Sequence, residues 1–334
     1  MGKSAGAGEF FDGKGMNVTD KTGNEQFAVT VLGRSVAESV VEQVVRLVAG
    51  HGLTVTGRRE LSDGTAGYGA VELAAEGVLR EEVALRGRIR ELVDAVGTDV
   101  AVQRESAARR DRRLFFFDMD STLIQAEVID ELAKMAGVGD QVVAITASAM
   151  RGEIQFQESF RRRVGLLKGL PEARVYELLD RIPLMEGAER LFTALTGLGV
   201  KSAVLSGGFT FFGESLRGRL GVDHVFANVL EFADGLVTGE VNSPIVDGAR
   251  KAKLLVEIAE REGVPLEQVV AVGDGANDLP MLARAGLGVA FHAKPVVRAT
   301  APVSLNHLGL DGLLYLLGLT DGDVAGLGGL DPVQ

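Results

Sequence analysis

The chain has 334 residues and a formal net charge of −11, from 35 Lys and Arg against 46 Asp and Glu, and it contains neither Cys nor Trp. The absence of Cys excludes disulfides, thiol nucleophiles, iron–sulfur clusters and zinc–thiolate sites. An acidic chain has no global attraction for nucleic acid or an anionic membrane, so neither is an expected partner. No apolar run approaches the roughly 18 to 20 residues of a membrane span. A polar, Gly-rich start without a signal-peptide core predicts a cytoplasmic protein with a disordered tail at residues 1–25.

The first periodic region, residues 26–105, predicts a small separate domain. Its apolar pattern gives the order βαββαβ, which is typical of ferredoxin-like folds. The predicted elements are strands at Phe27–Leu32, Leu53–Leu61, Tyr68–Ala75 and Asp99–Gln103, with helices at Glu38–Val48 and Glu81–Val96. Five Arg fall within residues 104–113, and we interpret 106–113 as a solvated linker.

Residues 114–318 alternate short apolar strands with helices, which predicts an α/β domain with a doubly wound parallel sheet. The predicted strands are Leu114–Phe117, Lys201–Leu205, Val269–Val272 and Gly288–Phe291. We therefore expect a Rossmann-like core at 114–124 and 187–318 and a helical cap at 125–186, inserted where such sheets bind ligands. The helices expected between the first two strands are Gln125–Ala136, Gln141–Arg151, Phe156–Leu167, Glu172–Arg181 and Ala188–Leu198. The pattern at Val225–Val241 predicts a β-hairpin with a turn at Asp234. Residues 319–334 are expected to form a flexible tail.

Several common active-site signatures are absent. There is no G-x-S-x-G elbow, no G-x-x-x-x-G-K-[ST] loop and no G-x-G-x-x-G fingerprint, and the four His are scattered without metal-binding spacing. The chemistry must therefore come from carboxylates, hydroxyls, backbone amides, Lys and Arg.

Carboxylates follow two of the buried strands. Asp118 and Asp120 come directly after Leu114–Phe117, and Asp274 and Asp278 follow Val269–Val272 together with the amide of Asn277. An unpaired buried charge is costly, so a cation is expected beside them. Because parallel strands end at one edge of a sheet, these groups form a hard oxygen site that suits Mg²⁺ better than zinc.

Two further signals point to anion binding. Ser206 and Gly207 follow the third strand and precede a helix, where a hydroxyl and backbone N–H groups can hold phosphate. Lys253, near the start of the helix Lys251–Glu262, can offset the charge of a phosphate. Each signal alone has a simpler reading: a helix cap for D-x-D, a turn for Ser-Gly-Gly, and a solvated side chain for the lysine.

In chain order, D-x-D-x-T, S-G, K and G-D-x-x-N-D resemble the four motifs of the haloacid dehalogenase superfamily. The match runs from Leu114 to about Leu317, and the intervening segments resemble the phosphoserine phosphatase family, with Glu127 at its expected distance after D-x-D. The segments that carry this resemblance are FQESFRRRVGLLKGL, SGGF, FAN and AVGDGANDLPML. The N-terminal domain resembles the ACT domain, an amino-acid-sensing unit that some of these enzymes carry.

The resemblance implies a Mg²⁺-dependent phosphatase that forms an aspartyl-phosphate. Asp118 would be the nucleophile and Asp120 the general acid and then the general base. Mg²⁺ would be bound by Asp118, the backbone carbonyl of Asp120 and Asp274. The residues expected to support the site or hold the phosphoryl oxygens are Ser206, the Gly207 amide, Lys253, Asn277 and Thr122, with Asp278 orienting Lys253 or a metal-bound water.

The implied substrate is O-phospho-L-serine, hydrolysed to L-serine and phosphate in the last step of serine biosynthesis. Glu127 would bind its ammonium group and Arg163 its carboxylate, while Met150 and Phe156 would form an apolar lid. Without the resemblance, Glu127 and Arg163 would be interpreted as a surface pair on amphipathic helices.

Two alternatives remain open at the level of sequence. The first is a phosphatase or phosphotransferase of the same fold that acts on another small phosphate ester, because the core motifs do not encode the leaving group. The second is a regulatory binding protein with an inactive core.

The loop Gly33–Ala37 keeps little of the ACT ligand site, so a homodimer through the N-terminal domain is expected rather than serine sensing.

Overall fold

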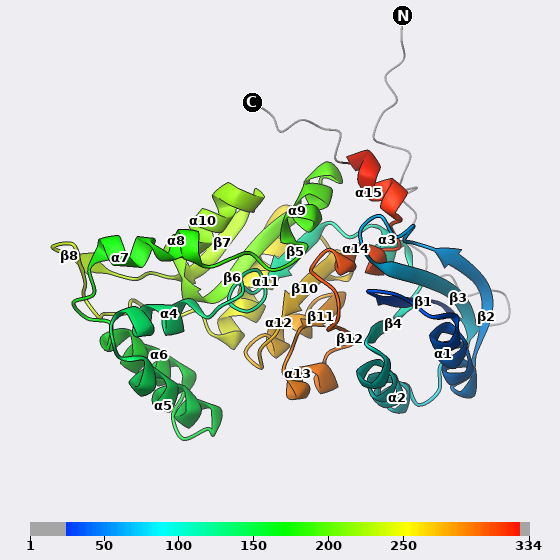
Figure 1. The fold of residues 1–334 in the computed structure, drawn as a ribbon, viewed down its shortest axis with the longest axis horizontal. Helices are drawn as coiled ribbons and strands as arrows, with labels where there is room; N and C mark the ends of the chain where they lie inside the picture. Colours follow the sequence, from blue (N-terminus) through cyan, green and yellow to red (C-terminus); the bar gives the residue numbers. More distant parts are fainter. Residues whose placement is uncertain (1–24, 328–334) are drawn as a thin grey trace, which may run out of the picture. The chain divides into compact units, whose positions relative to one another are not determined.

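The computed structural model describes residues 25–327, which form two compact units (Figure 1). The first unit contains residues 25–113, 303–308 and 312–327, and the second contains 114–302 and 309–311. The predicted tail at 1–25 falls outside the described residues except for Glu25. No helix among the described residues is both long enough and apolar enough to cross a membrane.

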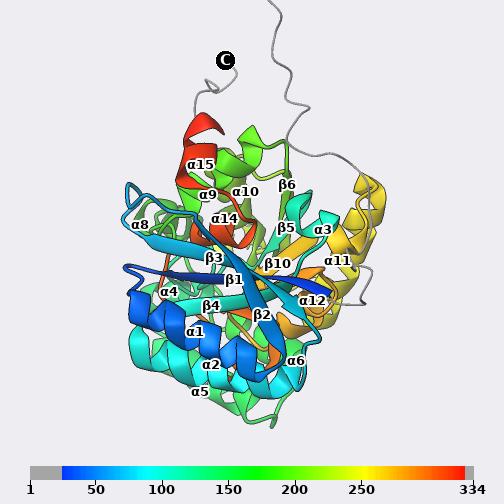
Figure 2. The ribbon, with the colours of Figure 1, turned by 90° about the vertical axis from the view of Figure 1, so that its right-hand side faces the viewer.

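The first unit has the predicted βαββαβ order. Its antiparallel sheet has the strand order β2-β3-β1-β4, and Figure 2 shows α1 and α2 together on one face of it. Valines of β1 and α1 pack against Leu73 of β3 in a shared apolar core. The bounds are β1 (Glu25–Gly33), α1 (Glu38–Gly50), β2 (Leu53–Glu60), β3 (Gly69–Gly77), α2 (Glu82–Val96) and β4 (Thr98–Arg104).

The segment predicted as a solvated linker is structured. It contains α3 (Ala107–Arg110), capped by the Ser106 hydroxyl, which accepts a hydrogen bond from the Arg109 N–H at 3.2 Å. Arg109 is only 1% exposed and forms ion pairs with Glu72 and Glu105. The prediction was wrong here because these carboxylates stabilise a buried guanidinium, which composition alone does not reveal.

The C-terminal segment differs from the prediction of an α/β domain up to residue 318 and a flexible tail at 319–334, of which residues 328–334 lie outside the described part of the chain. It contains β12 (Val303–Leu305), α14 (Gly312–Leu316) and α15 (Asp321–Leu327), and these residues group with the first unit rather than with residues 114–302. Buried Asp321 accepts hydrogen bonds from the Ser62 hydroxyl at 2.7 Å, the Asp63 N–H at 3.0 Å and the Tyr315 hydroxyl at 2.7 Å. This fixed carboxylate explains why residues 320–327 are ordered instead of frayed.

The second unit is a parallel sheet with an inserted helical cap. Within it, the strands follow the order β11-β10-β5-β6-β7, so the ends of β10, β5 and β6 are neighbours. These strands are β5 (Leu114–Phe117), β6 (Lys201–Phe209), β7 (His224–Asn228), β10 (Val269–Gly273) and β11 (Leu287–Phe291). The core helices are α9 (Ala188–Gly197), α10 (Thr210–Leu220), α11 (Gly248–Glu262), α12 (Leu279–Leu282) and α13 (Pro295–Thr300), with a 3₁₀ turn at Leu266–Gln268.

The predicted hairpin at Val225–Val241 is shorter than expected. Its first part, β7, pairs in parallel with β6, and only β8 (Phe232–Ala233) and β9 (Leu236–Val237) form the hairpin. Asp234 and Gly235 have positive φ angles of 51° and 73°, the conformation that a tight two-residue hairpin turn requires.

The cap consists of helices that follow β5. They are α4 (Val128–Met135), α5 (Gly139–Met150), α6 (Phe156–Gly165), α7 (Glu172–Tyr176) and α8 (Leu178–Arg181). Helices α5 and α6 lie side by side in Figure 1 and contact each other. The hairpin β8–β9 is joined to the cap by hydrogen bonds, including Gly169 N–H to Val237 O at 2.9 Å.

Candidate active site

The polar residues after β5, β6 and β10 meet at one edge of the sheet, beside a cavity of about 640 Å³. Core and cap both contribute to its walls. Of the residues singled out from the sequence, those lining the cavity are Asp118, Asp120, Glu127, Met150, Phe156, Arg163, Gly207, Asp274 and Asn277. Thr122, Ser206 and Asp278 are buried beside it.

Asp118 is held by two donors at the end of β5. Its Oδ1 accepts a hydrogen bond from the Met119 N–H at 2.7 Å and lies 2.8 Å from the Lys251 ammonium nitrogen. Its Oδ2 has only a long contact with the Asn277 amide nitrogen, at 3.5 Å, among the described residues. The carboxylate is therefore fixed through one oxygen, and the other is left facing the cavity residues.

The lysine at this site is Lys251, and the prediction of Lys253 was wrong. Lys251 is completely buried on α11 and forms ion pairs with Asp118 and Asp278, the latter at 2.7 Å. Burial lowers its pKa, but the two carboxylates outweigh burial and raise the pKa above its usual value, so the ammonium stays charged. Lys253 is 69% exposed and pairs with Glu257 at 3.5 Å on the outer face of the helix.

Asp278 positions Lys251 and the loop after β10. One carboxylate oxygen accepts from Lys251, and the other accepts from the Gly275 N–H at 3.0 Å. A Cβ on Gly273 would stand 2.5 Å from the Asp278 carboxyl carbon, so only glycine fits there. With both oxygens engaged in a fully buried site, Asp278 has a positioning role.

Asp118, Asp274 and Asp278 form a cluster in which one carboxylate oxygen from each lies within 4.8 Å of the others. Burial, followed by the charges of Asp118 and Glu127, raises the pKa of Asp274 to about 7. The Thr122 hydroxyl contacts the Asp274 carboxylate at 3.4 Å. Lys251 offsets part of the negative charge of Asp118 and Asp278, and the remaining charge of this set of hard oxygens fits a divalent cation.

Asp120 is a buried carboxyl group in a different environment. Burial, with added repulsion from Glu127 and Asp118, raises its pKa well above the usual range, so its protonated form is favoured. The Val128 N–H, at the start of α4, donates to Asp120 Oδ1 at 3.2 Å. A Cβ on Gly208 would lie 2.5 Å from the other oxygen, so this glycine leaves room for the carboxyl group.

The last part of β6, where its pairing with β7 shifts register between Leu205 and Phe209, is held by buried side chains. Fully buried Ser206 accepts a hydrogen bond from the Gly208 N–H at 2.8 Å. The Asn228 amide donates to the Gly207 carbonyl at 2.9 Å and accepts from the Val246 N–H at 2.9 Å. These bonds fix the Gly207–Gly208 segment of β6, which lines the cavity, whereas Ser206 does not line it.

The cap brings an acid and a base to the same cavity. The Ser121 hydroxyl donates to Glu127 at 3.2 Å, and burial together with Asp118 raises the pKa of Glu127, an effect that a bound cation would oppose. Arg163 lies on α6, and its Nε is buried without a hydrogen-bond partner. Met150, on α5, lines the cavity and is 71% exposed. The ring of Phe156 stacks on that of Phe160, with 6.2 Å between the ring centroids. Glu127 is exposed and Arg163 is partly buried, and both residues line the cavity.

Sequence reasoning missed several residues that line the cavity. They are Ile129, Asp130, Thr146, Ala149, Ser159, Phe160, Gly248, Ala276, Pro280 and Lys294. Lys294 is a cation whose charge lowers the pKa values of Glu127 and Asp274, against the larger effects that raise them. The sequence carried one usable signal for Lys251, which continues the buried stripe Leu254, Leu255 and Ile258 at helical spacing.

Comparisons with known proteins agree on one family. The haloacid dehalogenase-like hydrolase family matches residues 112–286. Phosphoserine phosphatase from Archaeoglobus fulgidus is 48% identical over 240 residues, which is 72% of this chain and 70% of that protein. The Saccharomyces cerevisiae phosphoserine phosphatase is 36% identical over 307 residues, covering 90% of this chain and 98% of that protein.

Solved structures give the same result. A probable phosphoserine phosphatase from Vibrio cholerae superposes with a TM-score of 0.68 at 33% identity, over 91% of this chain and 89% of that one. A phospho-aspartyl intermediate analogue of a phosphoserine phosphatase superposes with a TM-score of 0.58 at 42% identity, over 61% of this chain and 98% of that one.

Proposed function

Because the chain belongs to the phosphoserine phosphatases, within the haloacid dehalogenase-like hydrolases, we propose that it hydrolyses O-phospho-L-serine to L-serine and phosphate. One observation carries the mechanism: Asp118, fixed by Lys251, lies beside Asp120, whose pKa is raised well above its usual range. Two neighbouring carboxyl groups in environments this different can act as nucleophile and acid. The product L-serine places the reaction in serine biosynthesis.

In the first step, the Asp118 carboxylate attacks phosphorus and the bond from phosphorus to the serine oxygen breaks. Protonated Asp120 donates its proton to that oxygen, so L-serine leaves as the alcohol. In the second step, a water attacks the phosphorus of the aspartyl-phosphate and gives its proton to Asp120. Phosphate leaves, and both carboxyl groups return to their starting states.

The phosphoryl oxygens would be held by Lys251 and by the Gly207 and Gly208 backbone. Lys251 is buried, permanently charged and in contact with the nucleophile, which suits it to stabilise the developing charge. Gly207 and Gly208, at the end of β6, line the cavity, and the Ser206 hydroxyl accepts a hydrogen bond from the Gly208 N–H. Asn277, at 3.5 Å from Asp118, would support the same group.

The divalent cation would be Mg²⁺, held by Asp118, Asp274 and the Asp120 backbone carbonyl. The all-oxygen donor set and the absence of Cys favour it. Asp278 is left out because Lys251 and Gly275 occupy its oxygens. When bound, the ion supplies charge that shields the anionic nucleophile from the anionic phosphate.

Substrate choice would lie in the cap. Glu127 would bind the ammonium group and Arg163 the carboxylate, because the two side chains line one cavity and Arg163 has a buried unpaired nitrogen. Phe156 and Met150 would provide the apolar wall. The competing proposal, a different small phosphate ester, shares the core but does not need this acid–base pair.

The test is phosphate release by the full chain with Mg²⁺ from O-phospho-L-serine, O-phosphoethanolamine and β-glycerophosphate. We expect O-phospho-L-serine to have the highest kcat/KM and a chelator to abolish activity until Mg²⁺ is restored. Asp118→Asn should lower kcat by at least about 10³-fold, whereas Asp140→Asn, at an exposed cap position, should not. Unchanged turnover in Asp118→Asn would overturn the covalent mechanism, and a faster second ester would favour the competing substrate.

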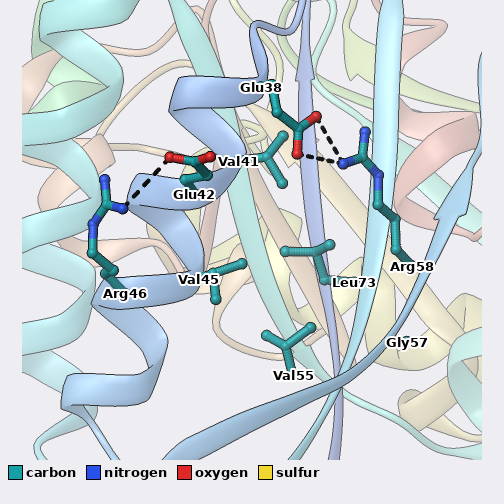
Figure 3. Close-up of a pocket in the computed structure, with 9 residues that line it drawn as sticks. All are labelled: Glu38, Val41, Glu42, Val45, Arg46, Val55, Gly57, Arg58 and Leu73. Carbon is teal, nitrogen blue, oxygen red and sulfur yellow. Dashed lines mark hydrogen bonds and ion pairs between the residues drawn. The ribbon is translucent and has the colours of Figure 1, made fainter.

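We also propose a homodimer through the first unit. Strand β2 is an edge of its sheet and its residues are mostly exposed. Beside it, a groove of about 450 Å³ has an apolar floor of Val41, Val45, Val55 and Leu73 (Figure 3). Its rim carries both signs of charge, in the pairs Glu38–Arg58 and Glu42–Arg46, which suits a self-complementary contact with a second copy.

A further inference from the structure

Three buried polar side-chain atoms without hydrogen-bond partners belong to residues that line the active-site cavity. They are Thr146 Oγ1, Ser159 Oγ and Arg163 Nε. Among the described residues of the second unit, the one other such side-chain atom is Arg298 Nε. Leaving a buried donor unpaired is costly, and a cluster of them at one cavity needs an explanation.

The three residues come from two cap helices that contact each other and line the same cavity. Ser159 and Arg163 are four residues apart on α6, and therefore lie on the same face of that helix. Thr146 belongs to α5, which packs against α6. Ser159 is 1% exposed, so its hydroxyl has no bulk water as a substitute partner.

Neither hydroxyl uses the partner that a helix offers. A helical Ser or Thr commonly donates to the carbonyl four residues earlier, yet neither Oγ makes that bond or any other. A change of χ1 is enough to redirect such a hydroxyl within the wall it already forms. The missing partner is therefore supplied by what enters the cavity.

We infer that the Ser159 and Thr146 hydroxyls, together with Arg163, form the subsite for the carboxylate of the substrate. This inference rests on the proposed function. A carboxylate accepts about four hydrogen bonds, and a single guanidinium fork leaves acceptor sites for two hydroxyls. The ammonium group is excluded from this wall because Arg163 would repel it, and the carboxylate of Glu127 is better suited to bind it.

The experiment compares two substrates that differ only in the carboxylate, O-phospho-L-serine and O-phosphoethanolamine. The readout is the ratio of their kcat/KM values. Ser159→Ala and Thr146→Val should each lower this ratio by roughly tenfold or more, the effect of losing a hydrogen bond to a charged group, mainly through KM for O-phospho-L-serine. Ser159→Thr, which keeps the hydroxyl, should retain most of the ratio.

Ser148→Ala is the matched control, because Ser148 lies on α5 but its hydroxyl donates to Glu153 instead of contributing to the cavity. If Ser159 and Thr146 had a purely structural role, their substitution would lower kcat/KM equally for both substrates and leave the ratio unchanged. That result would overturn the inference. Val has nearly the same shape as Thr, so Thr146→Val tests the inference if Ser159→Ala does not fold. Wild-type protein that does not prefer O-phospho-L-serine at all would instead refute the proposed function.

Discussion

Lys251 and Lys253 lie on the same helix, but only Lys251 contacts Asp118 in the candidate active site. Lys251 is completely buried between Asp118 and Asp278, whereas Lys253 is 69% exposed beside Glu257. We expect Lys251→Ala to lower kcat by about 10²- to 10³-fold, because it removes a preorganised charge from the nucleophile. Lys253→Ala should change it less than about twofold. Phosphate release, with circular dichroism to verify folding, measures both, and equal effects would contradict the assignment.

The acidic residues of the site and the four predicted cap residues all line the cavity or lie buried beside it, whereas the lysine was assigned to the wrong position. Asp118 and Asp274 directly follow strands so apolar that their position at the sheet edge could be inferred. Lys253 was chosen because it lies near the start of the helix, but the helical spacing of Lys251 with buried Leu254 and Ile258 shows that Lys251 is the lysine on the buried side. The unpaired hydroxyls of Thr146 and Ser159 carry no local sequence signal, because the packing of α5 against α6 creates them.

At the scale of elements, an ion-pair network joins β3 to the short helix α3. Burial raises the pKa of Glu72, but Arg109 and Arg59 outweigh burial and lower it below its usual value. A lowered pKa in the folded state contributes stability above the unfolded pKa, and this stability is lost as the pH falls through the folded value. Glu72 therefore stabilises the first unit at neutral pH and stops doing so in acid.

Glu72→Gln should remove this pH dependence and destabilise the unit by about 3 kcal/mol at pH 7, because it leaves Arg109 buried with one partner fewer. Urea unfolding followed by circular dichroism between pH 7 and pH 3 measures both effects. The control is Glu91→Gln, whose pair with Arg88 is exposed at 69% and 67% and should matter little. A wild-type acid profile that Glu72→Gln does not alter would argue against the network.

The same network explains why residues 106–113 are not the solvated linker that the sequence predicts. Five Arg in ten residues indicate a solvated segment, but the partner of Arg109 lies 37 residues earlier on β3. Likewise, Asp321 is fixed by Ser62, which is 259 residues away in the chain. Hydrophobic periodicity predicted the strands and helices because it is local, whereas these pairings arise only from the assembled unit.

At the scale of the whole molecule, a net charge of −11 does not oppose the binding of an anion. Arg163 and Lys294 line the cavity and buried Lys251 pairs with Asp118, so positive charge is concentrated where phosphate and carboxylate would bind. Net charge argues against a bulk polyanion as partner, but local recognition depends on a few fixed cations.

The proposed dimer is also a property of the whole molecule, and its surface is defined by the groove beside β2. Sedimentation velocity of the full chain should give about twice the chain mass of 35.2 kDa. Val45→Asp introduces a charge into the apolar floor, and burying it against a second copy would be costly, so the variant should sediment as a monomer. Val143→Asp adds the same charge at a cap residue that is 63% exposed and should remain dimeric. A wild-type monomer at tens of micromolar, or a Val45→Asp dimer as stable as the wild type, would exclude this surface as the interface.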